Sequence, residues 1–115
     1  MSIEQRDISD GPLVVKTTRD AEGYRISLRG ELDLANAATA ETQLRKALEA
    51  GDAPVIVDMS ELEFIDSTGI ALLVAALSPN GSTVELRFVP SSSAAVTRVL
   101  ELTGIAERLP LVEPA

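Results

Sequence analysis

The strongest structural signal in the chain is the segment VIVDMSELEFIDSTGIALLVAAL, which occupies residues 55–77. Its first three residues, Val55, Ile56 and Val57, are apolar and β-branched, which is typical of a strand buried among neighbouring strands. From residue 64 the segment reads FIDSTG and then becomes apolar, which predicts a helix that ends at about Leu77. Residues 79–82, PNGS, carry the turn signals that should stop this helix.

Another helix is predicted before this segment, over residues 34–50. Its apolar stripe consists of Ala37, Ala40, Leu44, Ala47 and Leu48. Gly51 follows at the position where a helix C-cap belongs. Because this helix leads into a buried strand, the pattern predicts a crossover connection within one sheet.

The N-terminal part of the chain predicts a flexible leader and then a pair of strands. Residues 1–12 are polar and end in Asp-Gly-Pro, so we expect a loose leader there. Strands are expected at residues 13–18 and 24–29, with a turn over residues 20–23. In the second strand, Tyr24, Ile26 and Leu28 alternate with polar residues, which indicates that one face of this part of the sheet is wet. The sequence GELD of residues 30–33 should end that strand.

The C-terminal part predicts one more strand and one more helix. Residues 84–89 alternate as a strand does, and the serines of residues 90–93 are candidate caps for a helix that Gly104 should end. Residues 105–112 should form a short turn and could add a last strand. The order β-β-α-β-α-β-α predicts a single α/β domain over residues 13–115, with a mixed sheet of four to five strands and helices packed mainly on one face.

Charge and composition exclude several classes of function. The chain has 115 residues and a formal net charge of -8, and it contains no run of Lys and Arg, which disfavours binding to nucleic acid or to an anionic membrane surface. The N-terminus lacks the apolar core of a signal peptide, and the apolar run of residues 70–77 is too short to span a bilayer. We therefore predict a cytoplasmic protein, without a heptad pattern or a long exposed strand, that is a monomer or a weak dimer.

No cofactor or metal ion is predicted. The chain contains neither cysteine nor histidine, so thiolate chemistry and the commonest metal ligand are both absent. Three aspartates, Asp33, Asp58 and Asp66, fall at the ends of strands or in loops, and such a cluster could bind Mg²⁺. Their spacing matches no metal-binding motif, however, and surface carboxylates are usually solvated.

The segment Asp66-Ser67-Thr68-Gly69 is the candidate functional site. A serine at a loop-to-helix junction commonly caps the first turn of the helix, and this structural explanation of Ser67 is the more common one. The same position also suits a phosphate group, because the N-terminus of a helix tolerates negative charge. Gly69 could permit a close approach of the backbone, or it could simply fit where the helix meets a strand.

Catalysis by Ser67 is not expected. A nucleophilic serine needs an adjacent base, but the chain has no histidine, and the spacing of its lysines, Lys16 and Lys46, does not suggest a base. The segment also lacks the small-x-Ser-x-Gly pattern of a hydrolase. We therefore predict that the chain is not an enzyme.

Four segments together resemble STAS domains, specifically the stand-alone anti-sigma factor antagonists of bacteria. The first matching segment is GELD at residues 30–33, together with Ala37, and the second is VIVDMS at residues 55–60. Next come FIDSTGI at residues 64–70 with Leu73, and LELTGI at residues 100–105. These pieces run in the order of the family and cover residues 13–112.

The resemblance implies a cycle in which partners are exchanged. The unphosphorylated antagonist would bind an anti-sigma factor that is also a serine kinase, and would thereby free a sigma factor. Phosphorylation of the residue that matches the family's acceptor, Ser67, would release the antagonist, and a serine phosphatase would reset it. Asp33, Asp66, Thr68 and Gly69 would shape the loop around the acceptor and its contacts with the partner.

A second interpretation within the same family remains open. Some STAS domains are not phosphorylated and serve as the small adaptor subunit of a lipid-transport ABC system. In that case the domain would hold an ATPase subunit by shape alone. The intact Asp-Ser-Thr-Gly sequence favours the phosphorylated switch over this adaptor.

Overall fold

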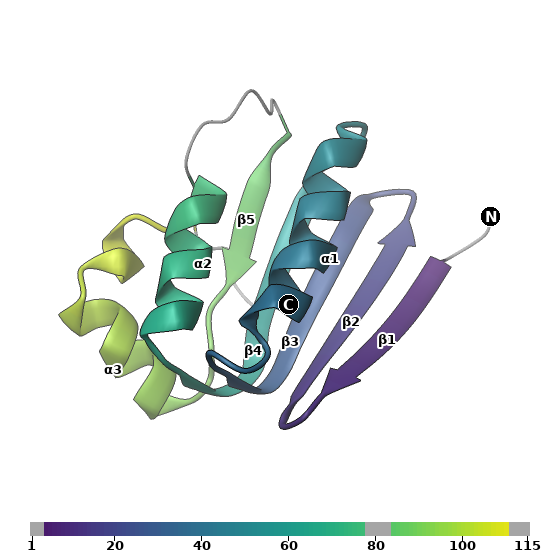
Figure 1. Cartoon of the computed structure of the whole chain (residues 1–115). Helices are drawn as coiled ribbons and strands as arrows, with labels where there is room; N and C mark the ends of the chain where they lie inside the picture. Colours follow the sequence, from purple (N-terminus) through teal and green to yellow (C-terminus); the bar gives the residue numbers. More distant parts are fainter. Residues whose placement is uncertain (1–3, 78–83, 111–115) are drawn as a thin grey trace.

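The computed structural model describes residues 4–77 and 84–110, and within them five strands form one sheet in the order β1-β2-β3-β4-β5. The strands are β1 (Glu4–Asp10), β2 (Leu13–Asp20), β3 (Gly23–Leu32), β4 (Val55–Ile65) and β5 (Leu86–Val89). The pairs β1–β2 and β2–β3 are antiparallel, whereas β3–β4 and β4–β5 are parallel. The predicted mixed sheet is therefore confirmed, with five strands (Figure 1).

The helices lie mainly on one face of this sheet, as predicted. Helix α1 (Ala37–Ala50) and helix α2 (Ser67–Leu77) lie side by side over the strands, and α3 (Ala94–Leu102) packs beside the C-terminal part of β4 (Figure 1). A short 3₁₀ helix, η1 (Ile105–Glu107), follows α3. Gly51 ends α1 in the left-handed conformation, with φ of 67°, which confirms the predicted C-cap.

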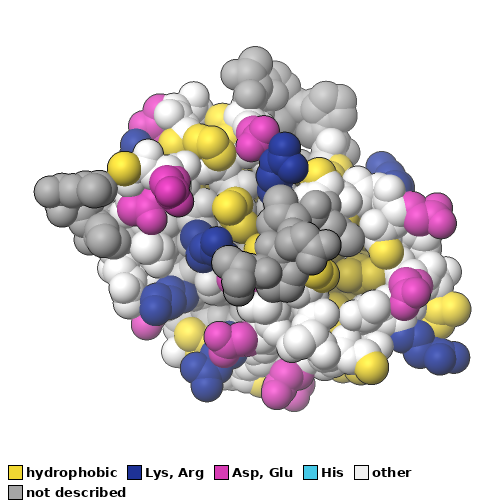
Figure 2. All heavy atoms as spheres, turned by 180° about the vertical axis from the view of Figure 1, so that it is seen from behind, with side chains coloured by type: hydrophobic (Ala, Val, Ile, Leu, Met, Phe, Trp, Pro, Cys, Tyr) yellow, Lys and Arg dark blue, Asp and Glu magenta, His cyan; other side chains and the backbone are white. Residues whose placement is uncertain are grey.

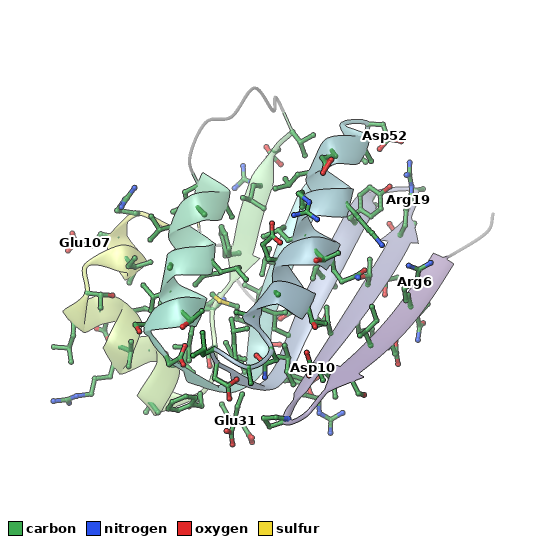
Figure 3. The ribbon with its side chains drawn as sticks, viewed as in Figure 1. Arg6, Asp10, Arg19, Glu31, Asp52 and Glu107 are labelled. Carbon is green, nitrogen blue, oxygen red and sulfur yellow. The ribbon has the colours of Figure 1, made fainter. Side chains whose placement is uncertain are left out.

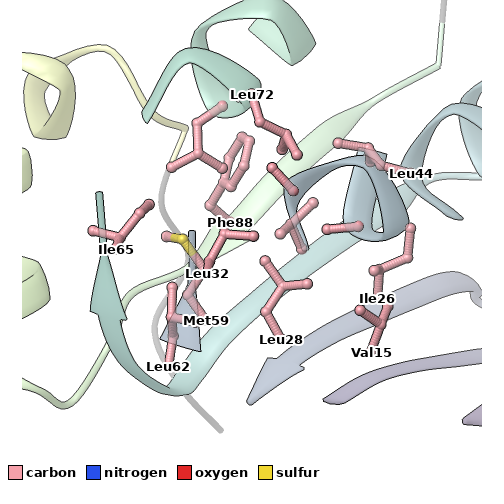
Figure 4. Close-up of a cluster of buried hydrophobic side chains, with 14 of the residues drawn as sticks. Val15, Ile26, Leu28, Leu32, Leu44, Met59, Leu62, Ile65, Leu72 and Phe88 are labelled. Atoms are coloured by element: carbon pink, nitrogen blue, oxygen red, sulfur yellow. The ribbon is translucent and has the colours of Figure 1, made fainter. Parts of the chain in front are cut away.

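The core lies between the helices and the sheet. Alternate residues of the central strands point into it, and Val15, Ile26, Leu28, Met59 and Phe88 are among those buried there (Figure 4). The helices supply the other side of this cluster, including Leu44, Leu72, Leu73, Val96 and Leu100. Burial of each large side chain contributes about 1.5–3 kcal/mol, so this layer holds α1, α2 and α3 against the sheet with their N-termini at the lower edge in Figure 1.

The predicted leader over residues 1–12 is wrong for residues 4–10, which form strand β1. Strand β1 pairs with β2 along its length, from Glu4 opposite Arg19 to Asp10 opposite Leu13. At its C-terminal end, Asp10 Oδ2 accepts a hydrogen bond of 2.6 Å from Thr39 Oγ1 of α1. An edge strand with little covered surface needs no alternation of apolar residues, so its polar sequence resembled a leader.

The predicted break at residues 30–33 is also wrong, because β3 continues to Leu32. The strand passes through Gly30 with φ of +96°, and the register against β4 shifts on either side of this residue. A side chain at Gly30 would collide with the carbonyl oxygen of Pro12, so glycine marks a bulge here and not an end. Strand β4 likewise extends from the predicted residues 55–57 to Ile65.

Smaller differences occur at other element ends. Helix α1 begins at Ala37 and not at residue 34, and β5 begins at Leu86 and not at residue 84. The serines of residues 91–93 do not cap α3 through their side chains. Their hydroxyl groups donate instead to carbonyl oxygens of β4, at Leu62, Ser60 and Glu63. Residues 79–82 and the end of the predicted last segment, residues 111 and 112, lie outside the described residues.

The face of the sheet turned away from α1 and α2 carries paired charges. Arg25 Nη1 lies 2.8 Å from Asp58 Oδ2, and Arg29 Nε lies 3.5 Å from Glu61 Oε2. Seen from behind, basic and acidic side chains are interspersed (Figure 2). Burial opposes the ionisation of Asp58, but hydrogen bonds from Ser60 and Arg25 outweigh it and hold the pKa of Asp58 below its usual value.

Candidate functional site around Ser67

Ser67 lies at the junction between β4 and α2, at the edge where the parallel strands end. It is the first residue of α2, and its side chain is exposed. Its hydroxyl group makes no hydrogen bond within residues 4–77 and 84–110. The side chain is therefore exposed, and its oxygen is free of hydrogen bonds in the described part of the chain.

Asp66, and not Ser67, caps helix α2. Asp66 Oδ1 accepts hydrogen bonds from the backbone N–H groups of Thr68, at 2.9 Å, and Gly69, at 3.1 Å. The carbonyl oxygen of Asp66 also accepts the first bond of the helix, from the N–H of Ile70 at 3.0 Å. The capping role that the sequence left open for Ser67 thus belongs to its neighbour.

The same aspartate joins α2 to the loop between β3 and α1. Asp66 Oδ2 accepts a hydrogen bond of 3.2 Å from the backbone N–H of Leu34. Asp33 lies next to Leu34, and Asp33 Oδ1 accepts from the N–H of Ala35 at 3.0 Å, which closes a tight turn. The structure therefore brings together Asp33 and Asp66, which are far apart in the sequence.

Asn36 supports this loop, although it was not among the residues predicted for the site. Its side chain is 1% exposed, its Oδ1 accepts from the N–H of Asp33 at 2.9 Å, and its Nδ2 donates to the carbonyl oxygen of Glu31 at 2.9 Å. A buried amide with both ends bonded fixes a loop strongly, because an unsatisfied buried group is costly. An asparagine directly before the apolar stripe of α1 was the available signal.

Gly69 allows α2 to approach the sheet closely. A Cβ atom at this position would lie 2.6 Å from Ile65 Cγ1 and 3.0 Å from two side-chain carbons of Leu32. Both neighbours are buried and cannot move away. Gly69 is therefore required by packing, and Thr68 contributes its backbone N–H to the cap.

Two exposed apolar side chains lie next to this motif. Leu34 is 77% exposed and Phe64 is 46% exposed. Leu34 is held to Asp66 through its amide, and Phe64 lies beside Glu31 in the register of β3 and β4. Phe64 is one of two phenylalanines in the chain, and the other, Phe88, is fully buried. Its place just before the Asp-Ser-Thr-Gly sequence could have marked it as a surface residue.

The arrangement offers an exposed hydroxyl group with no histidine or lysine beside it. The chain has no histidine, and its lysines lie elsewhere, Lys16 on β2 and Lys46 in the second half of α1. Among the residues that the structure describes, no group of three or more acidic side chains could hold a metal ion. Asp58, on the other face of the sheet, does not join Asp33 and Asp66. No helix in residues 4–77 or 84–110 has the length and apolar character to cross a membrane.

A family of known proteins matches most of this architecture. The sequence model of that family, described as "Mlab, STAS domain", matches residues 15–113. The chain belongs to the STAS domain family. The resemblance found in the sequence is thus confirmed, and the Ser67 site occupies the junction of β4 and α2 within that STAS domain.

Curated relatives and solved structures agree with this assignment. The chain is 25% identical over 95 residues to the anti-sigma-B factor antagonist of Staphylococcus aureus, covering 83% of this chain and 88% of the relative. It is 28% identical over 93 residues to the anti-sigma-F factor antagonist RsfB of Mycobacterium tuberculosis, covering 80% and 75%.

The fold is similar to that of solved anti-sigma factor antagonists. The structure of one from Mycobacterium paratuberculosis gives a TM-score of 0.73 at 23% identity, covering 99% of this chain and 87% of that one. SpoIIAA in its unphosphorylated form gives a TM-score of 0.66 at 17% identity, covering 99% and 89%. These likenesses confirm the α/β fold with its mixed sheet.

Proposed function

We propose that this STAS domain is an anti-sigma factor antagonist whose affinity for its partner is set by phosphorylation of Ser67. The unphosphorylated form binds an anti-sigma factor that is also a serine kinase, and this binding frees a sigma factor. The kinase then transfers a phosphoryl group from ATP to Ser67 Oγ and releases the antagonist. A serine phosphatase removes the phosphate, and the chain itself performs no catalysis. The names of the curated relatives support the antagonist role.

The observation that supports the proposal is that the hydroxyl group of Ser67 is exposed, while another residue, Asp66, caps helix α2. Because Asp66 supplies the cap, modification of Ser67 removes no hydrogen bond of the fold. The N–H groups of Thr68 and Gly69 are already occupied, so a phosphate on Ser67 cannot take them without displacing Asp66. The phosphate therefore remains at the surface, where it presents about -1.5 to -2 charges to a partner.

The surroundings of Ser67 supply a surface that a partner can bury. Leu34 and Phe64 offer apolar contact area next to the hydroxyl group. When the partner covers this area, a phosphate there must lose its water and lies near the carboxylates of Asp33 and Asp66. A cost of about 3 kcal/mol would weaken binding roughly a hundredfold, which is sufficient for a switch.

The proposal predicts opposite effects for two substitutions at one position. We expect Ser67→Asp to weaken binding to the anti-sigma factor about a hundredfold, and Ser67→Ala to leave a complex that ATP no longer dissociates. Binding is measured by calorimetry with each anti-sigma factor kinase of the source genome, with and without ATP and Mg²⁺. The phosphate is located by fragment mass spectrometry.

Thr68→Ala is the matched control, because it removes the neighbouring hydroxyl group. This variant should still be phosphorylated and released, since Thr68 contributes only its backbone N–H to the cap. A phosphate located on Thr68, or an unmodified chain with every kinase, contradicts the proposal. Capture of an ATPase subunit of a lipid transporter, equally by Ser67→Ala and Ser67→Asp, would instead assign the chain as a transport adaptor.

A further inference from the structure

A separate cavity lies between the second half of α1 and the strands β1, β2 and β3. It has a volume of about 520 Å³, and its lining includes Arg6, Thr17, Arg19, Tyr24, Gln43 and Lys46. The first turn of α1 is bonded to the end of β1, through Thr39 and Asp10. The cavity therefore lies farther along the helix, between its second half and the beginning of β1. Arg6 and Arg19 lie on neighbouring strands at this end (Figure 3).

The cavity gathers positive charge in an acidic protein. Three of the ten Lys and Arg residues line it, although the chain carries a formal net charge of -8. Arg6 and Lys46 form no ion pair within the described part of the chain. Arg19 is paired with Asp52 at 2.6 Å, and its guanidinium group lies 4.7 Å from the centre of the Tyr24 ring. Asp52 and Tyr24 thus hold Arg19 in place, while Arg6 and Lys46 have no acidic partner among the side chains that the structure describes.

Two uncharged polar side chains in the same cavity have no hydrogen-bond partner among the described residues. Gln43 is only 8% exposed, and its amide has no hydrogen bond within residues 4–77 and 84–110. The Thr17 hydroxyl group is buried and has no partner in that same part of the chain. Buried polar groups are nearly always bonded, so the buried Thr17 hydroxyl group facing this cavity indicates that something else satisfies it, while the Gln43 amide is open to the same space.

The cavity is distinct from the Ser67 site. Tyr24 begins the part of β3 that reaches the cavity, whereas Leu32 at the other end contacts the loop of Asp66. Eight residues of strand separate them, which corresponds to roughly 25 Å at about 3.3 Å per residue. Helix α1 runs between the two places, from the Asp33 loop to Gln43 and Lys46.

We infer that this cavity binds a small organic anion that carries a phosphate or a carboxylate group. Arg6 and Lys46 would neutralise the anionic group, and Gln43 and Thr17 would hydrogen-bond to it or to the polar groups beside it. The volume is that of an ordinary small-molecule site, and the ring of Tyr24 offers the ligand an apolar wall. Nothing in this inference depends on Ser67 or on a protein partner.

The test uses the full chain and three defined probes. Glucose 6-phosphate, citrate and glucose are titrated at constant ionic strength into ¹⁵N-labelled protein, and amide shifts are followed by NMR. We expect the amides of Thr17, Arg19 and residues 43–47 to shift with at least one anion and not with glucose. A response to glucose 6-phosphate alone assigns a phosphate ligand, and a response to citrate alone assigns a carboxylate.

Charge-matched variants separate this site from general attraction of anions. Lys46→Gln should weaken binding at least about tenfold, whereas Lys16→Gln, which removes the other lysine from the opposite side of β2, should leave it unchanged. Gln43→Leu tests the buried amide without removing charge. The inference is overturned if neither anion binds, if the shifts centre on residues 33–36 and 66–70, or if Lys16→Gln and Lys46→Gln weaken binding equally.

Discussion

Asp66 and Ser67, two adjacent residues at the end of β4, make different contacts. Asp66 forms the structural contacts, since its two carboxylate oxygens reach the first turn of α2 and the loop that contains Leu34. Ser67 forms none within the described residues and projects into solvent. The proposed phosphorylation of Ser67 would therefore remove no hydrogen bond that holds the fold.

Replacing these two residues should therefore have unequal effects on stability. We expect Asp66→Ala to lower the free energy of unfolding by about 1–2 kcal/mol, because two amides of the helix and one of the loop lose their acceptor. Ser67→Ala should change it by less than about 0.5 kcal/mol. Urea unfolding of both variants measures the difference.

Asp66→Asn provides the control for charge, because asparagine caps helices about as well as aspartate. It should keep the two bonds from α2 and lose the one from the N–H of Leu34, because an amide nitrogen cannot accept, so it should be less destabilising than Asp66→Ala. If Ser67→Ala is the more destabilising of the two alanine variants, the serine has a structural role that the geometry does not show.

At the scale of elements, β4 carries different chemistry on its two faces. Val57 and Met59 point into the core, whereas Asp58 points to the other face, where it accepts hydrogen bonds from Arg25 Nη1 and the N–H of Ser60. Burial disfavours the carboxylate, but these bonds prevail and lower the pKa of Asp58. The ionised side chain therefore stabilises the pairing of β3 with β4.

This lowered pKa gives a stability effect with a defined pH window. The contribution of Asp58 is fully present above the ordinary aspartate pKa of about 3.9 and is lost as the pH falls through the lower pKa of the folded state. We expect Asp58→Asn to cost about 1 kcal/mol at neutral pH. The difference from the unmodified protein should shrink as the pH falls below about 4.

Glu61→Gln is the comparison for this effect. Glu61 pairs with Arg29 at 3.5 Å, but both side chains are about 70% exposed, so this substitution should have little effect at any pH. Urea midpoints from neutral pH down to about pH 3 measure both variants. If Asp58→Asn lowers the free energy of unfolding by the same amount at every pH in this range, the charge of Asp58 is not the cause of its stabilising effect.

The elements differ in how well the sequence predicts them, for physical reasons. Strands with a buried face were predictable, because Ile26 and Leu28 alternate and residues 55–57 are continuously apolar. Strand β1 was not, because an edge strand leaves no apolar pattern, and Gly30 was misread because a bulge uses the same residue as a turn. For the site, the loop-to-helix position singled out residues 66–69, and the resemblance to a family supplied the roles expected of Ser67, Asp33 and Asp66. Leu34 and Asn36 depend on contacts across the loop that no local pattern encodes.

At the scale of the whole molecule, the fold keeps three surfaces apart. The Ser67 site lies at the edge where the parallel strands end, the cationic cavity lies at the opposite end of α1, and the paired charges cover the far face of the sheet. The exposed apolar side chains provide the test of which surface meets the protein partner.

Leu34→Ser and Phe64→Ser should each weaken binding to the anti-sigma factor by about 1–2 kcal/mol, which is roughly tenfold, because each removes apolar area next to Ser67. Leu34→Ser should leave the urea midpoint unchanged because Leu34 is 77% exposed, whereas Phe64→Ser should lower it, because Phe64 is only 46% exposed and loses packing. Leu102→Ser is the matched control, because Leu102 is 74% exposed against 77% for Leu34 but lies at the C-terminal end of α3. Calorimetry compares the three variants. If only Leu102→Ser weakens the complex, the partner binds α3, and Ser67 must then act at a distance from the interface and not within it.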